Sequence, residues 1–222
     1  MHIELGLIAA TKLAFANAGA IATLSGNAVS LIKKPNLIVK TVLAGMFFTA
    51  FMQAFHMPVG ASELHFIGTS IIYLFFGFLP TLFGFALGLL LQAIIFEPAD
   101  MMHLGVNILS LSLPLIGAHM LYGKKFFNQK NPKKVSWSSI VRFDAIYYAG
   151  VITMVGFWLS IGNEPTPFYN WAIFAIAYLP LVLIEPILTY GALKLSNSSL
   201  GNSAWGKRFL SRFSVTNQLK IS

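Results

Sequence analysis

Residues 65–96 read HFIGTSIIYLFFGFLPTLFGFALGLLLQAIIF, and this stretch decides the fold class because it contains no Lys, Arg, Asp or Glu. The rest of the 222-residue chain has the same character, with 56% hydrophobic and only 10% charged residues. Its mean hydropathy is +0.73, whereas a soluble domain carries about 25% charged residues. The composition therefore predicts an all-α, polytopic helical membrane protein that forms a single transmembrane domain over residues 1–222.

Hydropathy divides the chain into about seven candidate transmembrane spans. The predicted spans are residues 5–32, 37–55, 65–79, 81–96, 103–122, 140–162 and 169–193. The third and fourth are shorter than the roughly 20 residues that a full crossing requires. They could instead form one buried hairpin that is broken at Pro80, with incomplete or tilted helices.

The basic residues predict an orientation in which the N-terminus lies outside the cell and the C-terminus in the cytoplasm. With this orientation the loops at 33–40 and 123–142 and the basic tail at 194–222 hold 14 of the 15 Lys and Arg residues, and only Lys12 falls elsewhere. Such an asymmetry is typical of cytoplasmic loops in membrane proteins. The net charge of +8 is thereby explained without nucleic acid as a partner, and membrane lipid is the surface that we expect the basic loops to meet. The predicted location is the inner cell membrane.

Four of the five histidines, His2, His56, His65 and His103, gather at the predicted outer face, whereas His119 lies near the inner end of its span. The chain has no cysteine, so thiolate metal sites are excluded. If the N-terminus is not cleaved, the Met1 amine, the His2 amide nitrogen and the His2 imidazole can chelate one metal ion in adjoining five- and six-membered rings. A further histidine could fill the fourth corner of the square plane, and four planar nitrogens suit Ni(II) or Cu(II), and less strictly Co(II).

Two motifs resemble one known family. The opening Met1-His2-Ile3-Glu4-Leu5-Gly6, and the stretch from Met57 to Leu109 with its Pro-Val-Gly loop, Leu-Gln-Ala-x-x-Phe segment and Gly-x-Asn turn, resemble the substrate-capturing membrane component of cobalt and nickel energy-coupling-factor transporters. The resemblance implies that Met1, His2 and His65 hold Co(II) or Ni(II) as the transported substrate. It also implies two kinds of partner, a transmembrane scaffold subunit and cytoplasmic ATPase subunits. The loop before His65 departs from the family because it carries Glu63, so the choice between cobalt and nickel stays open.

Several other polar residues are candidates for supporting roles. Glu63 could be an axial ligand, could orient His65, could attract cations or could be a simple exposed acid. Gln92 and Asn107 could bind the N-terminal segment or pair between helices, and His56 and His103 could be ligands on the access path of the ion. Glu185, followed by Pro186 in the last span, is a functional candidate because ionisable residues inside a membrane are costly.

The chain is not expected to be an enzyme. It has no P-loop sequence, so ATP hydrolysis would take place on partner subunits. Two alternatives remain at this point. One is a non-metal membrane permease or assembly subunit, and the other is an intramembrane hydrolase in which His119 would act with a serine at 110 or 112.

Overall fold

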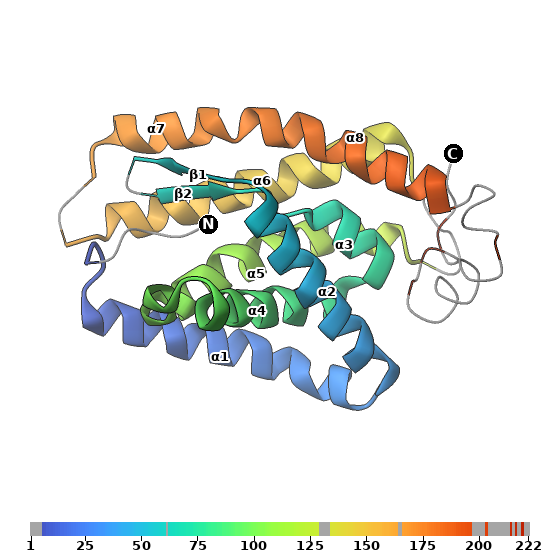
Figure 1. Ribbon diagram of the computed structural model, residues 1–222, viewed down its shortest axis with the longest axis horizontal. Helices are drawn as coiled ribbons and strands as arrows, with labels where there is room; N and C mark the ends of the chain where they lie inside the picture. The colour runs from blue at the N-terminus through green and yellow to red at the C-terminus, as the bar shows by residue number, and fades with distance from the viewer. Residues whose placement is uncertain are drawn as a thin grey trace.

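The computed structural model describes residues 6–60, 62–128, 134–163 and 166–196, together with four single residues of the C-terminal tail, and these form a helical bundle (Figure 1). The helices and strands are α1 (Ala10–Ile32), α2 (Asn36–Ala54), β1 (His56–Val59), β2 (Ser62–His65), α3 (Thr69–Phe76), α4 (Phe78–Ile95), η1 (Pro98–His103), α5 (Leu104–Leu121), η2 (Gly123–Lys125), α6 (Trp137–Ser160), α7 (Phe168–Ala177) and α8 (Leu179–Ser196). Six helical segments of the described chain are long and apolar enough to cross a membrane. The protein is therefore a multi-pass helical membrane protein.

The bundle is layered, with α1 along one side and α7 and α8 along the other (Figure 1). Helix α1 is largely exposed and packs mainly on α5, where Asn17 accepts a hydrogen bond of 3.0 Å from the Gly105 backbone N–H. Gly88 allows α2 and α4 to pack closely, since a side chain at this position would overlap Phe48. Close approach over small residues is a common way for helices to associate in lipid.

The third predicted span, residues 65–79, differs from the structure. This region contains the end of β2, an irregular segment at 66–68, the eight-residue helix α3 and the start of α4. Helix α3 is about 12 Å long at 1.5 Å per residue and cannot cross a membrane alone. The break between α3 and α4 lies at Gly77, whose φ of +88° ends a helix, and not at Pro80. Pro80 is the third residue of α4, a first-turn position at which the missing N–H costs no helical hydrogen bond.

Two further features are absent from the predicted pattern of spans. A two-stranded antiparallel hairpin, β1–β2, follows α2, with His56 paired to His65 and Val59 to Ser62. The last predicted span, residues 169–193, lies within one apolar segment, Phe168–Ser196, that is long enough to cross a membrane, but its helix is interrupted at Tyr178, between α7 and α8. Pro180 near the start of α8 explains the division, because it has no N–H with which α7 could continue.

Candidate metal site

The β1–β2 hairpin places three polar side chains on one face. Side chains alternate between the two faces of a strand, so Glu63 and His65 of β2 share a face. His56 lies directly opposite His65 in the antiparallel register. The two imidazole rings stack, with their centroids 5.8 Å apart and their planes inclined by 20°.

Glu63 bridges the two histidines. Its Oε1 lies 2.8 Å from His56 Nδ1 and its Oε2 lies 3.1 Å from His65 Nε2. The side chain of His65 is only 1% exposed, whereas that of His56 is 47% exposed. One carboxylate thus joins a buried imidazole to a second imidazole at the surface of the described chain.

The surroundings of His65 favour one arrangement of hydrogens on its ring. A neutral imidazole has one N–H and one nitrogen with a lone pair. The Met52 carbonyl oxygen can only accept, and it lies 3.4 Å from His65 Nδ1 in hydrogen-bonding geometry, so it favours the hydrogen on Nδ1. The lone pair is then on Nε2, which faces the Glu63 carboxylate at 3.1 Å. A ring nitrogen with a lone pair beside a carboxylate is a favourable neighbour for a cation, and a ring N–H that donates to a backbone carbonyl is a common way to orient a metal-binding imidazole.

Further acids lie close to this hairpin. Burial raises the pKa of Glu97 above its usual value, and the neighbouring Asp100, through a hydrogen bond and its charge, and Glu63, through its charge, raise it further. His56 acts on the same group in the opposite direction. This end of the bundle therefore concentrates negative charge beside the histidines, which favours the approach of cations.

The N-terminal segment is fastened to the same end of the bundle. The Asn163 backbone N–H donates to the Leu7 carbonyl at 2.7 Å, and its side-chain amide donates to the Gly6 carbonyl at 3.0 Å. Figure 1 shows the start of α1, the end of α6, the start of α7 and the hairpin's turn at one end of the bundle. Five residues precede Gly6, and an extended chain of that length spans up to about 17 Å. Residues 1–5 themselves lie outside the described residues.

The other predicted site residues do not belong to the hairpin. Gln92 in α4, His103 at the end of η1 and Asn107 in α5 are all buried, with exposures of 0%, 1% and 1%. Met1 and His2 lie outside the described residues. Within the described ranges, no group of three or more His, Cys, Asp or Glu side chains is placed to hold a metal ion by itself. The ligand set of Met1, His2 and His65 therefore stays a prediction.

Sequence reasoning missed one polar cluster. Asp144 in α6 and Ser70 in α3 are completely buried and are joined by a hydrogen bond of 2.9 Å, next to the predicted candidate Glu185. Asp144 lies in the apolar helix Trp137–Ser160. The cost of an ionisable residue in such a helix was the signal that could have identified it.

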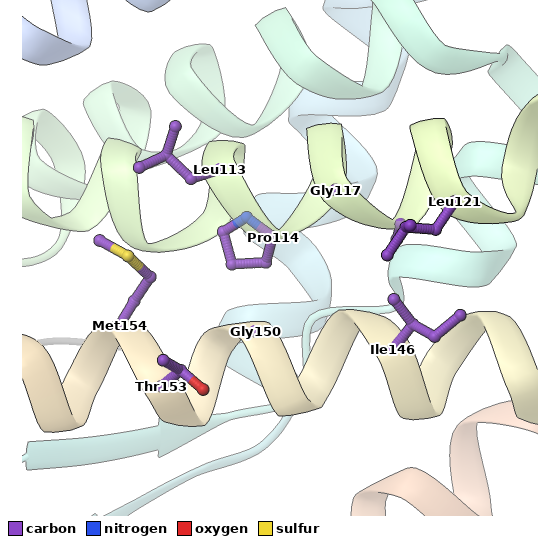
Figure 2. Close-up of a pocket in the computed structure, with 9 residues that line it drawn as sticks. Leu113, Pro114, Gly117, Leu121, Ile146, Gly150, Thr153 and Met154 are labelled. Carbon is purple, nitrogen blue, oxygen red and sulfur yellow. The ribbon is translucent and has the colours of Figure 1, made fainter.

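A cavity of about 310 Å³ between α5 and α6 is a poor candidate for the metal site (Figure 2). Figure 2 shows Ile146, Thr153 and Met154 of α6 pointing towards α5. Its lining is mostly apolar and includes no His, Asp or Glu. Ions require polar ligands, so the histidine hairpin is the better candidate.

Known proteins share both the sequence pattern and the fold. The chain is 26% identical over 197 residues to a protein of Haemophilus influenzae (strain ATCC 51907 / DSM 11121 / KW20 / Rd) named "Putative metal transport protein", with 88% of this chain and 92% of the relative covered. A solved structure described as that of a transition metal transporter has a similar fold, with a TM-score of 0.67 and 16% sequence identity over 94% of this chain and 98% of the other. The sequence model of one family, the cobalt uptake substrate-specific transmembrane region, matches residues 2–199. The chain belongs to this family of cobalt-uptake membrane components.

Proposed function

We propose that this protein is the substrate-specific membrane subunit of an energy-coupling-factor importer and captures Co(II) or Ni(II) from outside the cell. The metal ligands are the Met1 amine, the amide nitrogen and imidazole of His2, and the imidazole of His65. The buried His65 carries the proposal, because its hydrogen bond to the Met52 carbonyl turns Nε2 towards the Glu63 carboxylate at the base of the hairpin. The anchoring of Gly6 to Asn163 supports it, because it holds the chain in place four residues after His2.

In the proposed capture step the metal ion exchanges water for nitrogen ligands. The amine and the amide must lose protons to bind, so capture releases protons. Because two of the three ligating residues lie in the first two positions of the chain, they can be withdrawn without dismantling a helix. Withdrawal of this segment weakens the ligand set and allows release. The energy for transport comes from ATPase subunits, acting through a scaffold subunit in the membrane.

The two alternative functions have less support. Membership of the cobalt-uptake family argues against a non-metal permease. For a hydrolase, His119 would need a serine partner, but its Nδ1 lies 2.6 Å from the Tyr73 hydroxyl. Ser110 accepts a hydrogen bond of 2.8 Å from the Trp158 indole and donates to a backbone carbonyl.

The test is equilibrium binding of Co(II) and Ni(II) to purified protein with a free N-terminus and a C-terminal tag. We expect one metal ion per chain, and we expect that His2→Ala, His65→Ala or a short N-terminal extension each abolish tight binding. His119→Gln is the matched control, because His119 lies away from the hairpin and should not affect binding. Tight binding that survives both His2→Ala and His65→Ala would refute the proposed site.

A further inference from the structure

Helices α3, α6 and α8 meet at a cluster of polar side chains that the proposed metal site does not use. Asp144, Glu185, Ser70 and Thr189 are all completely buried. The Ser70 hydroxyl lies 2.9 Å from Asp144 Oδ2, 3.2 Å from Glu185 Oε1 and 2.7 Å from the Thr189 hydroxyl. In the described part of the chain, neither carboxylate forms an ion pair with Lys, Arg or His.

The Ser70 hydroxyl has three oxygen neighbours at hydrogen-bonding distance and only one hydrogen of its own. The Thr189 hydroxyl supplies a second hydrogen, and an ionised carboxylate can only accept. With both carboxyl groups ionised, the single Ser70 hydrogen would be shared between Asp144 and Glu185. A protonated carboxyl group, on either Asp144 or Glu185, gives each contact its own hydrogen. Two ionised carboxylates on one hydroxyl, both removed from water, would also repel each other strongly.

The two carboxyl groups have unequal environments. Glu185 accepts hydrogen bonds from the Ser70 backbone N–H at 2.8 Å and from the Tyr148 hydroxyl, and the Gly68 backbone also bonds to it. These contacts place it at the N-terminus of α3, where the helix dipole favours negative charge. Asp144 has no such donors, and among the described residues its Oδ1 has no hydrogen-bond partner. Glu185 is thus suited to the ionised form and Asp144 to the protonated one.

We propose that Asp144 and Glu185 form a proton-binding site inside the membrane. The site holds one proton on the Asp144 carboxyl group, which donates a hydrogen bond to the Ser70 hydroxyl. Loss of this proton to solvent leaves two carboxylates on either side of one hydroxyl, and their repulsion weakens the contact of α6 with α3 and α8. Ser70 follows His65 by five residues in the chain. A change of protonation therefore alters the packing of the helix that directly follows the hairpin. The site does not depend on the metal ligands.

The test is infrared spectroscopy of the whole purified protein at neutral pH without added metal, because a protonated carboxylic acid has a carbonyl stretching band that a carboxylate lacks. Asp100 and Asp144 are the only aspartates of the chain, which makes isotope labelling selective. We expect a carboxylic-acid band that shifts in D₂O. Aspartate carrying ¹³C in its side-chain carboxyl group should move this band, whereas glutamate labelled in the same way should not.

Variants identify which aspartate carries the proton. Asp144→Asn should remove the band and the matched control Asp100→Asn should keep it. Three results would overturn the proposal: no band in the native protein, a band that moves only with labelled glutamate, or a band that Asp100→Asn removes. A band that appears only after sodium has been removed would also overturn it, because the cluster would then hold a monovalent cation. The labelling results stand even if Asp144→Asn fails to fold.

Discussion

Replacing Glu63 with alanine removes the carboxylate that holds His56 Nδ1 at 2.8 Å and His65 Nε2 at 3.1 Å. The first contact involves a half-exposed histidine and contributes little, because exposed ion pairs are worth about 0–1 kcal/mol. The second faces the buried Nε2 of His65, and the loss of such a neighbour of a metal ligand costs about 1.4–2.8 kcal/mol of binding free energy. Since a tenfold change in affinity corresponds to about 1.4 kcal/mol, we expect metal affinity to fall about 10–100-fold, as is usual when the partner of a metal-binding histidine is lost.

The assay is calorimetric or equilibrium-dialysis titration of the Glu63→Ala protein with Co(II) and Ni(II). Glu63→Gln should lose less affinity, because the amide keeps the size of the side chain and an acceptor oxygen and loses only the negative charge that attracts the metal ion. His56→Ala is the control for the exposed contact and should change affinity by no more than about fivefold, within the value of an exposed ion pair. An affinity that Glu63→Ala leaves unchanged would refute the reasoning and make Glu63 a simple exposed acid. Complete loss, as expected for His65→Ala, would make it a direct ligand.

Three other changes test the structure around this site. Gly68→Ala should destabilise the protein by at least about 1–2 kcal/mol, because Gly68 has a φ of +67° and an added Cβ would overlap an aromatic ring of α2. Thermal unfolding in detergent measures this loss. Gly117→Ala is the control, because a Cβ at Gly117 would meet nothing within 4 Å. Glu97→Gln should raise the unfolding temperature at neutral pH. Burial and then its acidic neighbours raise the pKa of Glu97 in the folded state. The contribution of Glu97 to stability is therefore greatest below its unfolded pKa and is lost as the pH rises through its folded pKa. The advantage of the variant should vanish in acid, and an advantage that persists there would contradict this cause. Asn163→Ala removes one hydrogen bond to Gly6, worth about 1 kcal/mol, and should weaken metal binding about fivefold with little change in unfolding temperature; unchanged binding would show that this anchor does not position the ligands.

The class of fold is predictable from the sequence because lipid imposes it. Long apolar segments such as residues 10–32 and 137–160 can cross a membrane only as helices, and the structure has helices there. Local departures were harder to predict. The helix α3 ends at Gly77 because of that residue's backbone conformation, which hydropathy does not register.

The candidate site was likewise predictable from the sequence only in part. The pairing of His56 with His65 depends on the register of a hairpin that lies between two apolar helices, and the pattern of spans contains no signal for it. The bridging role of Glu63 follows only once that register is known. Asp144 is different, because an acid within an apolar helix is visible in the sequence. Its partner Ser70 is 74 residues away in the chain, so only the packing of α3 against α6 reveals the pair.

The most direct test of the central claim is X-ray absorption spectroscopy of the metal-loaded protein with a free N-terminus, beside His65→Ala loaded under the same conditions. The ligand set predicts a first shell of nitrogen atoms with the scattering pattern of two imidazoles, those of His2 and His65. In His65→Ala that pattern should fall to one imidazole, or the metal should be absent. A first shell without imidazole, or one that His65→Ala leaves unchanged, would contradict the claim.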